Sequence, residues 1–504
     1  MKPCVYLVGA GPGDPGLITV KALELIKDAD AVVYDYLSNP FFLSQVSTNC
    51  KLINAGKRLG FKALTQKKIN EKLIFLVKSG YKKIVRLKGG DPFLFGRGGE
   101  EAEELKKNRI NFEIVPGITS AIAVPAYAGI PVTHRDMTST LSIVTGHEDP
   151  DKNESSIDWS SLSRMKSIIF LMGTKNLKKN LSNLISNGMP KKTNIAVINW
   201  GTYSKQKTVT GNLINIHEEI QKNKIKSPSI VVIGDICKMR SKLNWFEKKP
   251  LFGKNIIVTR ARKNSSKLSK KIIELGGNPI EIPTIEIKPK SSKTIRTNLN
   301  KINSYEWLVF TSVNGVEIFF DEFLKINNDI RKLGNLKIAT IGSETARSLN
   351  KLNLSVDLIP DKFTAEGLLN SFKKLKIRKS KIFIPRASLA RDTLVSGLRK
   401  IGNEVKEVKI YDTILPSKLT KKDVLNKVSG VNIDFITFTS SSTVDNFFKY
   451  ITPKKVKSNK NIKFVVIGPI TGKRLLTYGI RPHLICKKFT IDNLLDEIVK
   501  YKNK

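Results

Sequence analysis

The chain has 504 residues, of which 40% are hydrophobic, enough for two or three domains with buried cores. No apolar run reaches the roughly 18 residues of a membrane-spanning helix. Glycine and proline interrupt the opening apolar stretch where a signal peptide would continue. We therefore expect a cytoplasmic protein without a membrane partner. Four widely spaced cysteines with no C-x-x-C pair predict reduced thiols and no metal site.

The charge balance is extreme, with 87 lysines and arginines against 44 aspartates and glutamates and a formal net charge of +43. A polyanionic partner such as RNA, or a carboxylate-rich small molecule, would use such a charge. A lysine-rich composition would produce it without any function. The lysines are scattered through every segment, and no aromatic-basic RNA-binding motif occurs among them. We favour the compositional explanation and expect no nucleic-acid partner.

The first predicted strand, "CVYLV", runs into the loop V-G-A-G-P-G-D-P-G-L-I-T at residues 8–19. Gly9 and Gly11 fit a dinucleotide-binding G-x-G-x-x-G turn, but Asp14 occupies the third glycine position and would repel a pyrophosphate. A cofactor with a cationic centre and no phosphate fits this loop better. S-adenosyl-L-methionine, a sulfonium compound, is such a cofactor, and glycines allow the backbone to approach it closely.

Short β-rich runs alternate with amphipathic stretches up to about residue 245, which predicts an α/β fold. The run "RLKGGDPFLFGRGGEE" places Gly89, Gly90 and Asp91 at the end of a strand. The run "VPGITSAIAVPAYAGIPVTHRD" places Thr119 and Ser120 at the start of a helix. Ligands of open α/β sheets bind at such strand ends, so these residues are candidates for a binding site.

Two charged residues of the first half are candidates for acid–base chemistry. Asp35 ends the strand "AVVYD", and Lys57 lies in "NAGKRLG". A carboxylate beside an electron-rich carbon can take its proton, and an ammonium group can donate one or hold a carboxylate. From position alone, a turn cap for Asp35 and a solvated lysine for Lys57 are the more ordinary interpretations.

Aromatic, proline and glycine residues near 246–254 precede a fresh strand at Ile256 and predict a domain boundary. The second half contains an internal repeat, with an offset of 126 to 128 residues between related segments. The related pairs are 256–283 with 382–409, 309–323 with 437–451, and 340–360 with 466–486. The second half is therefore predicted to consist of two similar α/β lobes.

Each repeat unit ends a strand in hydroxyl residues and then starts a helix. These residues are Thr311, Ser312, Ser343, Ser440, Ser441 and Thr471. The free N–H groups and the dipole of a helix N-terminus suit a carboxylate or a phosphate. Ordinary N-capping by serine and threonine is the alternative. Matched turns on two lobes make an anion-binding cleft a hypothesis worth testing.

The first half resembles uroporphyrinogen-III C-methyltransferase over residues 3–246, in the runs quoted above and in "GKR", "TGH", "FLMG" and "KLNWF". The resemblance implies two α/β lobes with S-adenosyl-L-methionine between them, two methylations of uroporphyrinogen III to precorrin-2, and a homodimer formed through this half. It makes Asp35 the proton acceptor and Lys57 the proton donor, while Tyr36 replaces the usual basic residue after the aspartate. The implied cofactor site consists of Pro12, Gly89, Gly90, Asp91, Leu94, Thr119, Ser120, Met172 and Gly201.

The second half is similar to uroporphyrinogen-III synthase over about 254–502, through the bilobal repeat, "FTS" twice, "IGSETA", "FTAEGLL", "VKIYDT" and "IGPITGKRL". This resemblance implies cyclisation of hydroxymethylbilane with inversion of ring D. Tyr411 falls where the family has a tyrosine that helps the hydroxyl group to leave. The expected substrate-binding residues of the cleft are Thr311, Ser312, Thr345, Ser440 and Thr471. Ile470 stands where the family often has a further threonine.

The two resemblances support each other, because the product of the second half is the substrate of the first. The expected limits are 1–246 for the methyltransferase, 247–253 for a linker and 254–504 for the synthase, with one lobe at about 254–283 plus 414–504 and the other at about 284–413. Alternatives are a methyltransferase of the same superfold that acts on ribosomal RNA or a later precorrin, and a non-catalytic tetrapyrrole carrier.

Overall fold

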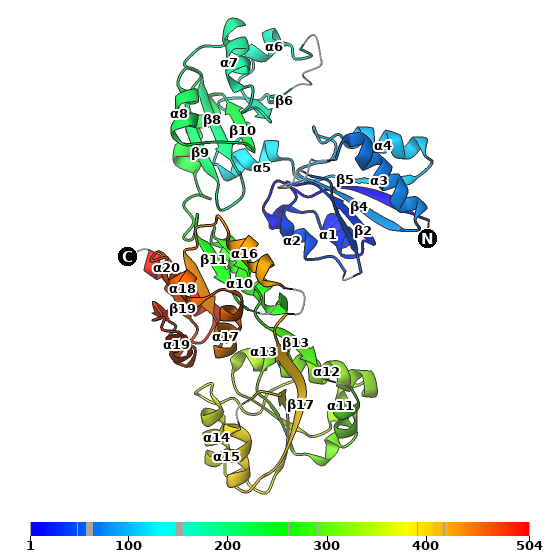
Figure 1. Cartoon of the computed structure of the whole chain (residues 1–504), viewed down its shortest axis with the longest axis vertical. Coiled ribbons are helices and arrows are strands. Elements are labelled where there is room, and N and C mark those ends of the chain that lie inside the picture. Colours follow the sequence, from blue (N-terminus) through cyan, green and yellow to red (C-terminus); the bar gives the residue numbers. More distant parts are fainter. Residues whose placement is uncertain are drawn as a thin grey trace. The chain divides into compact units, whose positions relative to one another are not determined.

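The computed structural model describes residues 2–47, 49–56, 64–147, 155–260, 262–290, 292–390, 392–416 and 419–502. The chain forms two compact units, and each is described by itself (Figure 1). The first unit comprises residues 1–255, 271–278 and 501–504, and the second comprises 256–270 and 279–500. Within the described ranges, no helix has the length and apolar character needed to cross a membrane.

The first sheet of the first unit is wholly parallel, in the order β3-β2-β4-β1-β5. Its strands are β1 (Cys4–Gly9), β2 (Ala31–Tyr34), β3 (Lys51–Asn54), β4 (Lys83–Lys88) and β5 (Asn111–Val115). The helices are α1 (Val20–Lys27), α2 (Pro40–Leu43), α3 (Gln66–Lys78) and α4 (Gly98–Lys107). Apolar side chains fill both faces, as parallel strands require. One core contains Leu73 of α3 and Leu105 of α4, and the other contains Ile26 of α1 and Phe42 of α2.

The second sheet of this unit is mixed, in the order β6-β7-β10-β8-β9, with only β6 and β7 parallel. Its strands are β6 (Ser142–Thr145), β7 (Ile168–Leu171), β8 (Asn194–Asn199), β9 (Lys207–Asn212) and β10 (Ser229–Ile233). The helices are α5 (Ser120–Tyr127), α6 (Trp159–Ser163), α7 (Leu177–Ser186), α8 (Ile216–Lys222) and α9 (Arg240–Leu243). α7 and α8 pack against one face, and α5 packs against the other, where Ala121 and Val124 are buried.

Residues 247–253, expected as a linker, lie in the first unit. Glu247 accepts hydrogen bonds from Gln206 (2.9 Å) and Thr208 (2.7 Å) and pairs with Arg240 at 2.5 Å. Leu251 is fully buried, and its N–H donates to the carbonyl of Leu275 at 2.8 Å. The segment is therefore packed on the first unit through side chains and backbone alike.

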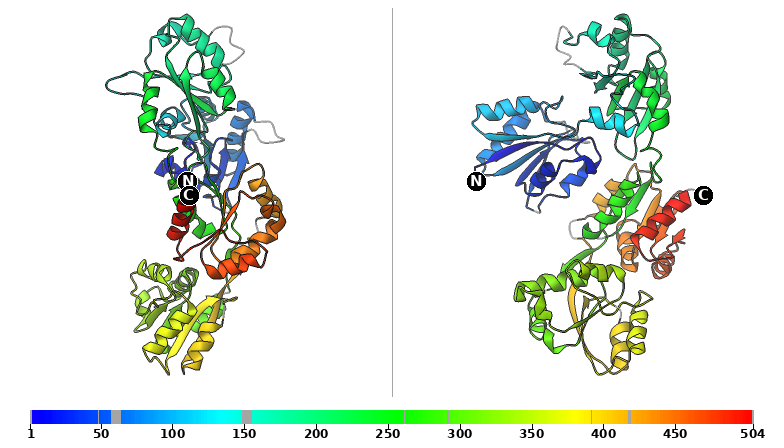
Figure 2. Two further views of the ribbon diagram at one scale, coloured as in Figure 1. Left: turned by 90° about the vertical axis from the view of Figure 1, so that its left-hand side faces the viewer. Right: turned by 180° about the vertical axis from the view of Figure 1, so that it is seen from behind.

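The second unit has two sheets, in the orders β12-β11-β18-β19-β20 and β13-β17-β16-β14-β15. The strands of the first are β11 (Asn255–Val258), β12 (Asn278–Glu281), β18 (Phe435–Phe438), β19 (Lys463–Val466) and β20 (Leu484–Ile485). Those of the second are β13 (Glu286–Pro289), β14 (Trp307–Phe310), β15 (Lys337–Thr340), β16 (Lys381–Ala387) and β17 (Glu404–Ile414). Figure 2 shows each sheet flanked by its own helices.

The helices of the first of these lobes are α10 (Arg262–Glu274), α16 (Lys421–Val428), α17 (Ser441–Tyr450), α18 (Pro453–Lys457), α19 (Pro469–Leu476) and α20 (Ile491–Lys502). Those of the second are α11 (Ser292–Leu299), α12 (Val313–Asn327), α13 (Ser343–Asn350), α14 (Ala365–Lys374) and α15 (Thr393–Lys400). Phenylalanines dominate both cores. Phe319 and Phe323 of α12 stack at 5.8 Å, and Phe438 meets Phe447 edge-on at 5.5 Å.

The internal repeat predicted from the sequence is confirmed as a repeat of topology. The strand order β12-β11-β18-β19 in one lobe corresponds to β17-β16-β14-β15 in the other, element for element in the predicted pairs. The isolated parallel bridge between Ala339 and Leu358 also has a counterpart, which is the parallel pairing of Val465 with Leu484. The predicted α/β fold class, with two lobes in each half of the chain, is therefore confirmed.

Candidate active site

The opening glycine loop joins the end of β1 to the end of β4. Gly90 N–H donates to the carbonyl of Gly11 at 2.8 Å, and Gly11 N–H donates back at 3.2 Å. A third strand end meets them, because a Cβ on Gly9 would lie 2.5 Å from the Cα of Gly117. These three glycine-containing strand ends are packed backbone against backbone, so each needs a residue without a side chain.

Asp91 holds two of these loops in place. Its Oδ1 accepts hydrogen bonds from the N–H groups of Phe93 (2.8 Å) and Leu94 (3.0 Å). Its Oδ2 accepts from the N–H of Gly117 at 2.9 Å. A carboxylate that accepts three backbone N–H groups fixes the loops that carry them, so Asp91 shapes the site through the backbone.

Asp14, the acid at the third glycine position, connects the opening loop to the second sheet. Its N–H donates to Thr202 Oγ1 at 3.0 Å, and its Oδ2 accepts from the hydroxyl of Tyr127 at 2.7 Å. Burial and this hydrogen bond raise the pKa of Tyr127 well above its ordinary value, so the phenol remains a donor. The loop that contains Pro12 is thereby fastened to α5 and to the segment after β8.

The start of α5 lies beside the glycine of β4. Thr119 caps this helix, with Oγ1 accepting from the N–H of Ala121 at 3.2 Å. The N–H nitrogen of Ser120 is the atom nearest to where a Cβ of Gly90 would lie, at 3.8 Å. Gly90 has a φ of +70°, which favours glycine independently of the space around it. The ends of β1 and β4 and the start of α5 therefore converge.

Gly89 precedes Gly90 after β4, where a Cβ would lie 3.0 Å from Leu37 Cβ. The other three predicted cofactor residues follow strands of the second sheet or pack against its core. Leu94 packs against the core cluster that contains Ala121 and Val124 of α5. Gly201 is tight against the same helix, since a Cβ there would lie 2.3 Å from Val124 Cγ1. Met172 follows β7 with a φ of +58° and is half exposed. Strained non-glycine residues of this kind are frequent at binding sites.

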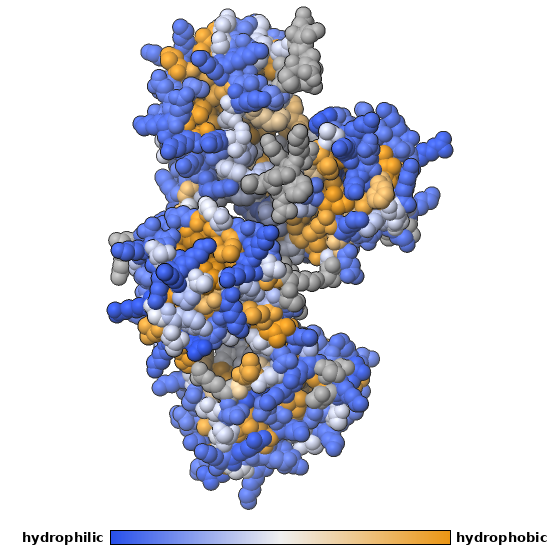
Figure 3. Space-filling model, viewed as in Figure 1, coloured by the Kyte–Doolittle hydropathy of each residue, from blue (hydrophilic) through white to orange (hydrophobic). Residues whose placement is uncertain are grey.

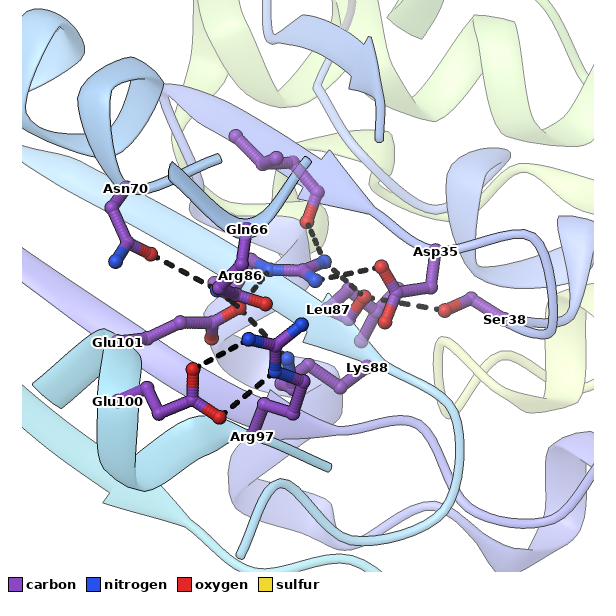
Figure 4. Close-up of polar contacts among 11 residues, drawn as sticks. Asp35, Ser38, Gln66, Asn70, Arg86, Leu87, Lys88, Arg97, Glu100 and Glu101 are labelled. Carbon is purple, nitrogen blue, oxygen red and sulfur yellow. Dashed lines mark hydrogen bonds and ion pairs between the residues drawn. The ribbon is translucent and has the colours of Figure 1, made fainter. Parts of the chain in front are cut away.

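Asp35 lies at the carboxyl end of β2, beside β4 (Figure 4). Its N–H donates to the carbonyl of Leu87 at 3.1 Å, which fixes the backbone of the turn. Its Oδ1 pairs with Nη2 of Arg86 at 2.7 Å. The side chain is 31% exposed, so the carboxylate is anchored through Oδ1 and still partly accessible from solvent. Tyr36, next in the chain, is exposed.

A buried group of charges lies behind Asp35 and was missed by the sequence analysis. Oε1 of Glu101 on α4 accepts from Nε of Arg86 (3.1 Å), Nζ of Lys88 (2.8 Å) and Nε2 of Gln66 (3.1 Å). Burial lowers the pKa of Lys88, with the neighbouring Arg86 adding to the effect. The signal in the sequence was two cations at alternate positions of the buried strand "IVRLK", which places both on one face.

Lys57, the predicted proton donor, lies outside the described residues. Several large apolar side chains are exposed in this unit, and the space-filling view has apolar surface on the lobe of the first sheet (Figure 3). They include Tyr36, Leu37, Phe41, Phe93 and Phe95. Most of them follow the carboxyl ends of β2 and β4, where the glycine loops and Asp35 also lie.

In the second unit, Tyr411 and Ser312 are in contact. The Tyr411 hydroxyl lies 2.9 Å from Ser312 Oγ, and either atom can be the donor. Ser312 also caps α12, because its Oγ accepts from the N–H of Gly315 at 3.0 Å. Burial raises the pKa of Tyr411, and the hydrogen bond with Ser312 opposes this. Tyr411 is therefore a protonated phenol at neutral pH. Thr311 precedes the cap and is half-buried.

The other predicted cleft residues occupy matched helix starts. Ser440 caps α17 in a capping box with Thr443. Thr345 and Thr471 are each the third residue of their helices, α13 and α19, and both are buried. The N-capping interpretation therefore holds for Ser312 and Ser440, whereas Thr345 and Thr471 lie within the first turn of their helices.

Two family models match separate parts of the chain. That of Tetrapyrrole (Corrin/Porphyrin) Methylases matches residues 4–216, and that of Uroporphyrinogen-III synthase HemD matches residues 266–496. The first match covers most of the unit with the glycine loops and Asp35. The second covers both sheets of the repeat. The fold and the two matches together define a tetrapyrrole-biosynthesis protein with a methylase part and a synthase-like part.

A "Porphyrin biosynthesis protein HemD" of Ruminiclostridium josui is 38% identical over 498 residues, which are 98% of this chain and 97% of that protein. The chain belongs to this family, and in this chain the region that matches tetrapyrrole methylases precedes the region that matches uroporphyrinogen-III synthase HemD, as the sequence motifs predicted. The "S-adenosyl-L-methionine-dependent uroporphyrinogen III methyltransferase" of Methanosarcina barkeri is 51% identical over 233 residues, 46% of this chain and 91% of that protein.

Among solved structures, the Uroporphyrin-III C-methyl transferase of Thermus thermophilus complexed with S-adenyl homocysteine is similar to the first half. It is 30% identical, and the similarity covers 46% of this chain and 98% of that one, with a TM-score of 0.40.

Proposed function

We propose that the chain is a bifunctional enzyme of tetrapyrrole biosynthesis. Residues 254–504 cyclise hydroxymethylbilane to uroporphyrinogen III with inversion of ring D, and residues 1–246 methylate that product twice with S-adenosyl-L-methionine to give precorrin-2. The observation that carries this proposal is the presence of both family regions in one chain, which a porphyrin biosynthesis protein matches over nearly its full length. The two reactions are consecutive, so the fusion is chemically coherent.

The glycine loops of the first unit fit S-adenosyl-L-methionine as cofactor. The cofactor supplies an electrophilic methyl group on a sulfonium centre. Gly9 and Gly117 let the strand ends pack together, Gly90 leaves space beside the start of α5, and Asp14 makes the opening loop unsuited to a pyrophosphate. We place the cofactor against Pro12, Gly89, Gly90, Asp91, Leu94, Thr119, Ser120, Met172 and Gly201.

In the proposed reaction, Asp35 removes the proton that leaves after methylation. Transfer of a sulfonium methyl group to an electron-rich macrocycle would form a C–C bond, break the S–C bond to leave a neutral thioether, and put positive charge on the ring system, which loss of a proton neutralises. The open side of the Asp35 carboxylate can take that proton, while Arg86 holds the other side. Lys57 is proposed as proton donor on the family resemblance alone.

In the synthase half, we propose that Tyr411 protonates the departing hydroxyl of hydroxymethylbilane, so that it leaves as water. Ring D then attacks the resulting cation through the carbon that bears its methylene bridge, the bond from that carbon to the bridge breaks and re-forms at the free carbon of the ring, and that carbon loses its proton, so ring D ends up inverted. Ser312 can return a proton to the phenol, because the two hydroxyls share a hydrogen bond. Thr311, Thr345, Ser440 and Thr471 are proposed to contact the substrate at the helix starts, where N–H groups suit its carboxylates.

We also propose that the chain forms a homodimer through the first half. The support is the set of large apolar side chains exposed on that unit, which are more extensive than isolated surface residues (Figure 3).

The test is to supply hydroxymethylbilane and S-adenosyl-L-methionine to the full chain and to identify the product by mass and by isomer. We expect dimethylated product of the type III series. A parallel reaction with preformed uroporphyrinogen III isolates the methylase. The synthase assignment would be contradicted if the chain methylates preformed uroporphyrinogen III but gives only the type I isomer from hydroxymethylbilane. A bound tetrapyrrole that is never converted would indicate a carrier.

Exchange of Gly117 for alanine should weaken cofactor binding at least about tenfold, equivalent to about 1.4 kcal/mol. The new Cβ would lie 2.3 Å from the carbonyl oxygen of Gly90, so the two loops must separate. Overpacking of this kind also costs about 1–3 kcal/mol of stability. Calorimetric titration with S-adenosyl-L-methionine and thermal unfolding measure both effects.

Gly99→Ala is the matched control for this prediction. Gly99 lies in the first turn of α4, and a Cβ there would meet no atom within 4 Å. Alanine in a helix is favoured over glycine by roughly 0.5–1 kcal/mol, so this variant should bind the cofactor normally and unfold no earlier than the wild type. Normal cofactor affinity in Gly117→Ala would mean that the loop junction is not part of the cofactor site.

A further inference from the structure

The guanidinium group of Arg86 is held on every side. Nη2 pairs with Asp35 Oδ1 at 2.7 Å, and Nε pairs with Glu101 Oε1 at 3.1 Å. Nη1 faces the carbonyls of Val33 (3.5 Å) and Leu87 (3.3 Å). Figure 4 shows the planar group between the two carboxylates. All three nitrogens are engaged, so the guanidinium has one orientation.

The exposure of these charges is graded from the interior to the surface. The side chain of Glu101 is 0% exposed, that of Arg86 is 2% exposed and that of Lys88 is 4% exposed, whereas Asp35 is 31% exposed. The two cations and two anions balance, and Asp35 is the member that reaches the surface. The arrangement presents one oxygen of a single carboxylate to solvent and keeps the rest of the network inside the lobe.

A gain in folding stability does not explain why these four charges are placed together. Removing four charges from water is expensive, and replacing buried ion pairs by apolar residues of similar volume is often neutral or stabilising. Among the described residues, moreover, buried Glu101 Oε2 has no hydrogen-bond partner, which adds a desolvation cost without a compensating contact. Burial of charge beside a carboxylate at a strand end is typical of sites where a reactive group is held in position.

We propose that Arg86 is a positioning residue for Asp35, and that Glu101, with Lys88, holds Arg86 in the orientation that aims the free oxygen of Asp35 at the substrate. This inference rests on the proposed function, in which Asp35 accepts the proton released on methylation. Arg86 does not touch the substrate or the cofactor in this scheme. It acts through Asp35, by fixing where the second carboxylate oxygen points.

The first test is the variant Arg86→Lys in the full chain, assayed with uroporphyrinogen III and S-adenosyl-L-methionine. Lysine keeps the charge but loses the planar fork that reaches Asp35 and Glu101 at once. We expect kcat to fall about 10- to 100-fold through misplacement of the carboxylate, while the KM for the cofactor changes less than about twofold. The glycine loops that line the cofactor site do not depend on Arg86.

A double-variant cycle separates positioning from a general loss of structure. In the Asp35→Asn background the carboxylate that Arg86 positions is gone. Adding Arg86→Lys there should change kcat by less than about threefold, because residues that act as a unit are not additive. Full additivity of the two effects would overturn the inference, since Arg86 would then act independently of Asp35.

Arg386→Lys is the matched control. Arg386 is an equally buried arginine in the other unit, paired with Glu407 at 2.8 Å and Asp392 at 3.0 Å. Its exchange should disturb a buried ion network to a similar degree and leave the methylation rate unchanged. If both variants lower methylation alike, the effect of Arg86 is a stability effect and the inference is wrong.

Glu101→Gln tests the network even if Arg86→Lys does not fold. The amide oxygen can accept the same three hydrogen bonds as Oε1, and the NH₂ group replaces the unpartnered Oε2. Because these hydrogen bonds hold Arg86 in its orientation, we expect kcat to fall less than about threefold in Glu101→Gln, whereas Glu101→Leu, which removes them, should lower kcat about tenfold with unchanged cofactor KM. Equal kcat in the two folded variants would overturn the inference. Absence of methylation by the wild-type chain would overturn the proposed function and the inference with it.

Discussion

Replacement of Asp35 by asparagine is expected to slow methyl transfer by about 10²–10⁴ while leaving the affinity for S-adenosyl-L-methionine near that of the wild type. Asparagine keeps the shape and can accept from Arg86, but it cannot take up a proton at neutral pH. The glycine loops proposed to hold the cofactor are joined through Gly11, Gly90 and Asp91, and none of these contacts involves the Asp35 side chain. Single-turnover rates with uroporphyrinogen III, together with calorimetric cofactor binding, separate the two properties.

Asp30→Asn provides the control for this variant. Asp30 lies at the opposite end of the same strand, where its Oδ2 accepts hydrogen bonds from the N–H groups of Lys82 (2.9 Å) and Lys83 (2.8 Å). The Asp30→Asn exchange should lower the stability of the fold and leave the methylation rate unchanged. If Asp35→Asn turns over uroporphyrinogen III at the wild-type rate, Asp35 is a turn residue and the proton is taken by another group.

The fold was predictable from the sequence because its signals are local. Alternation of apolar strands with amphipathic helices predicts α/β lobes, and the repeat of 126 to 128 residues fixed which strands of the two lobes correspond. What local patterns did not predict is the mixed character of the second sheet. Strand direction there is decided by pairing between distant segments, such as β10 between β7 and β8.

The candidate site was predictable where glycine and aspartate mark strand ends, as at Gly89, Gly90, Asp91 and Asp35. The groups that hold it together were not, because their partners are remote in sequence. Asp14 meets Tyr127 and Thr202, which are 113 and 188 residues away. Glu101 belongs to an ordinary-looking acidic helix start, and only the fold brings it against the cations of β4.

Replacement of Tyr411 by phenylalanine should lower the rate of enzymatic cyclisation at least about tenfold and increase the share of type I product, because the uncatalysed closure then competes. The ring remains in the core of its lobe, so folding should be retained. Since burial raises the pKa of Tyr411 above its ordinary value near 10, the wild-type rate should not fall between pH 7 and pH 9 through loss of this proton.

Tyr305→Phe is the control for loss of a phenol. Tyr305 lies in the same lobe and packs against Phe383 at 5.2 Å, and its exchange should leave the isomer ratio unchanged. Separation of type I and type III uroporphyrinogen by chromatography gives the result for both variants. Purely type III product at full rate from Tyr411→Phe would remove Tyr411 from the mechanism.

Ser312→Ala extends this prediction, because Ser312 has two roles that can be separated. It caps α12 and it hydrogen-bonds to Tyr411, so its loss should cost about 1 kcal/mol of stability and also disturb the phenol. Thr364→Ala removes an equivalent cap, since Thr364 Oγ1 accepts from the N–H of Gly367 at 3.0 Å at the start of α14. Both variants should unfold earlier by a similar margin, but only Ser312→Ala should shift product toward type I. Equal isomer ratios in the two variants would reduce Ser312 to a helix cap and leave Tyr411 without a proton partner in the mechanism.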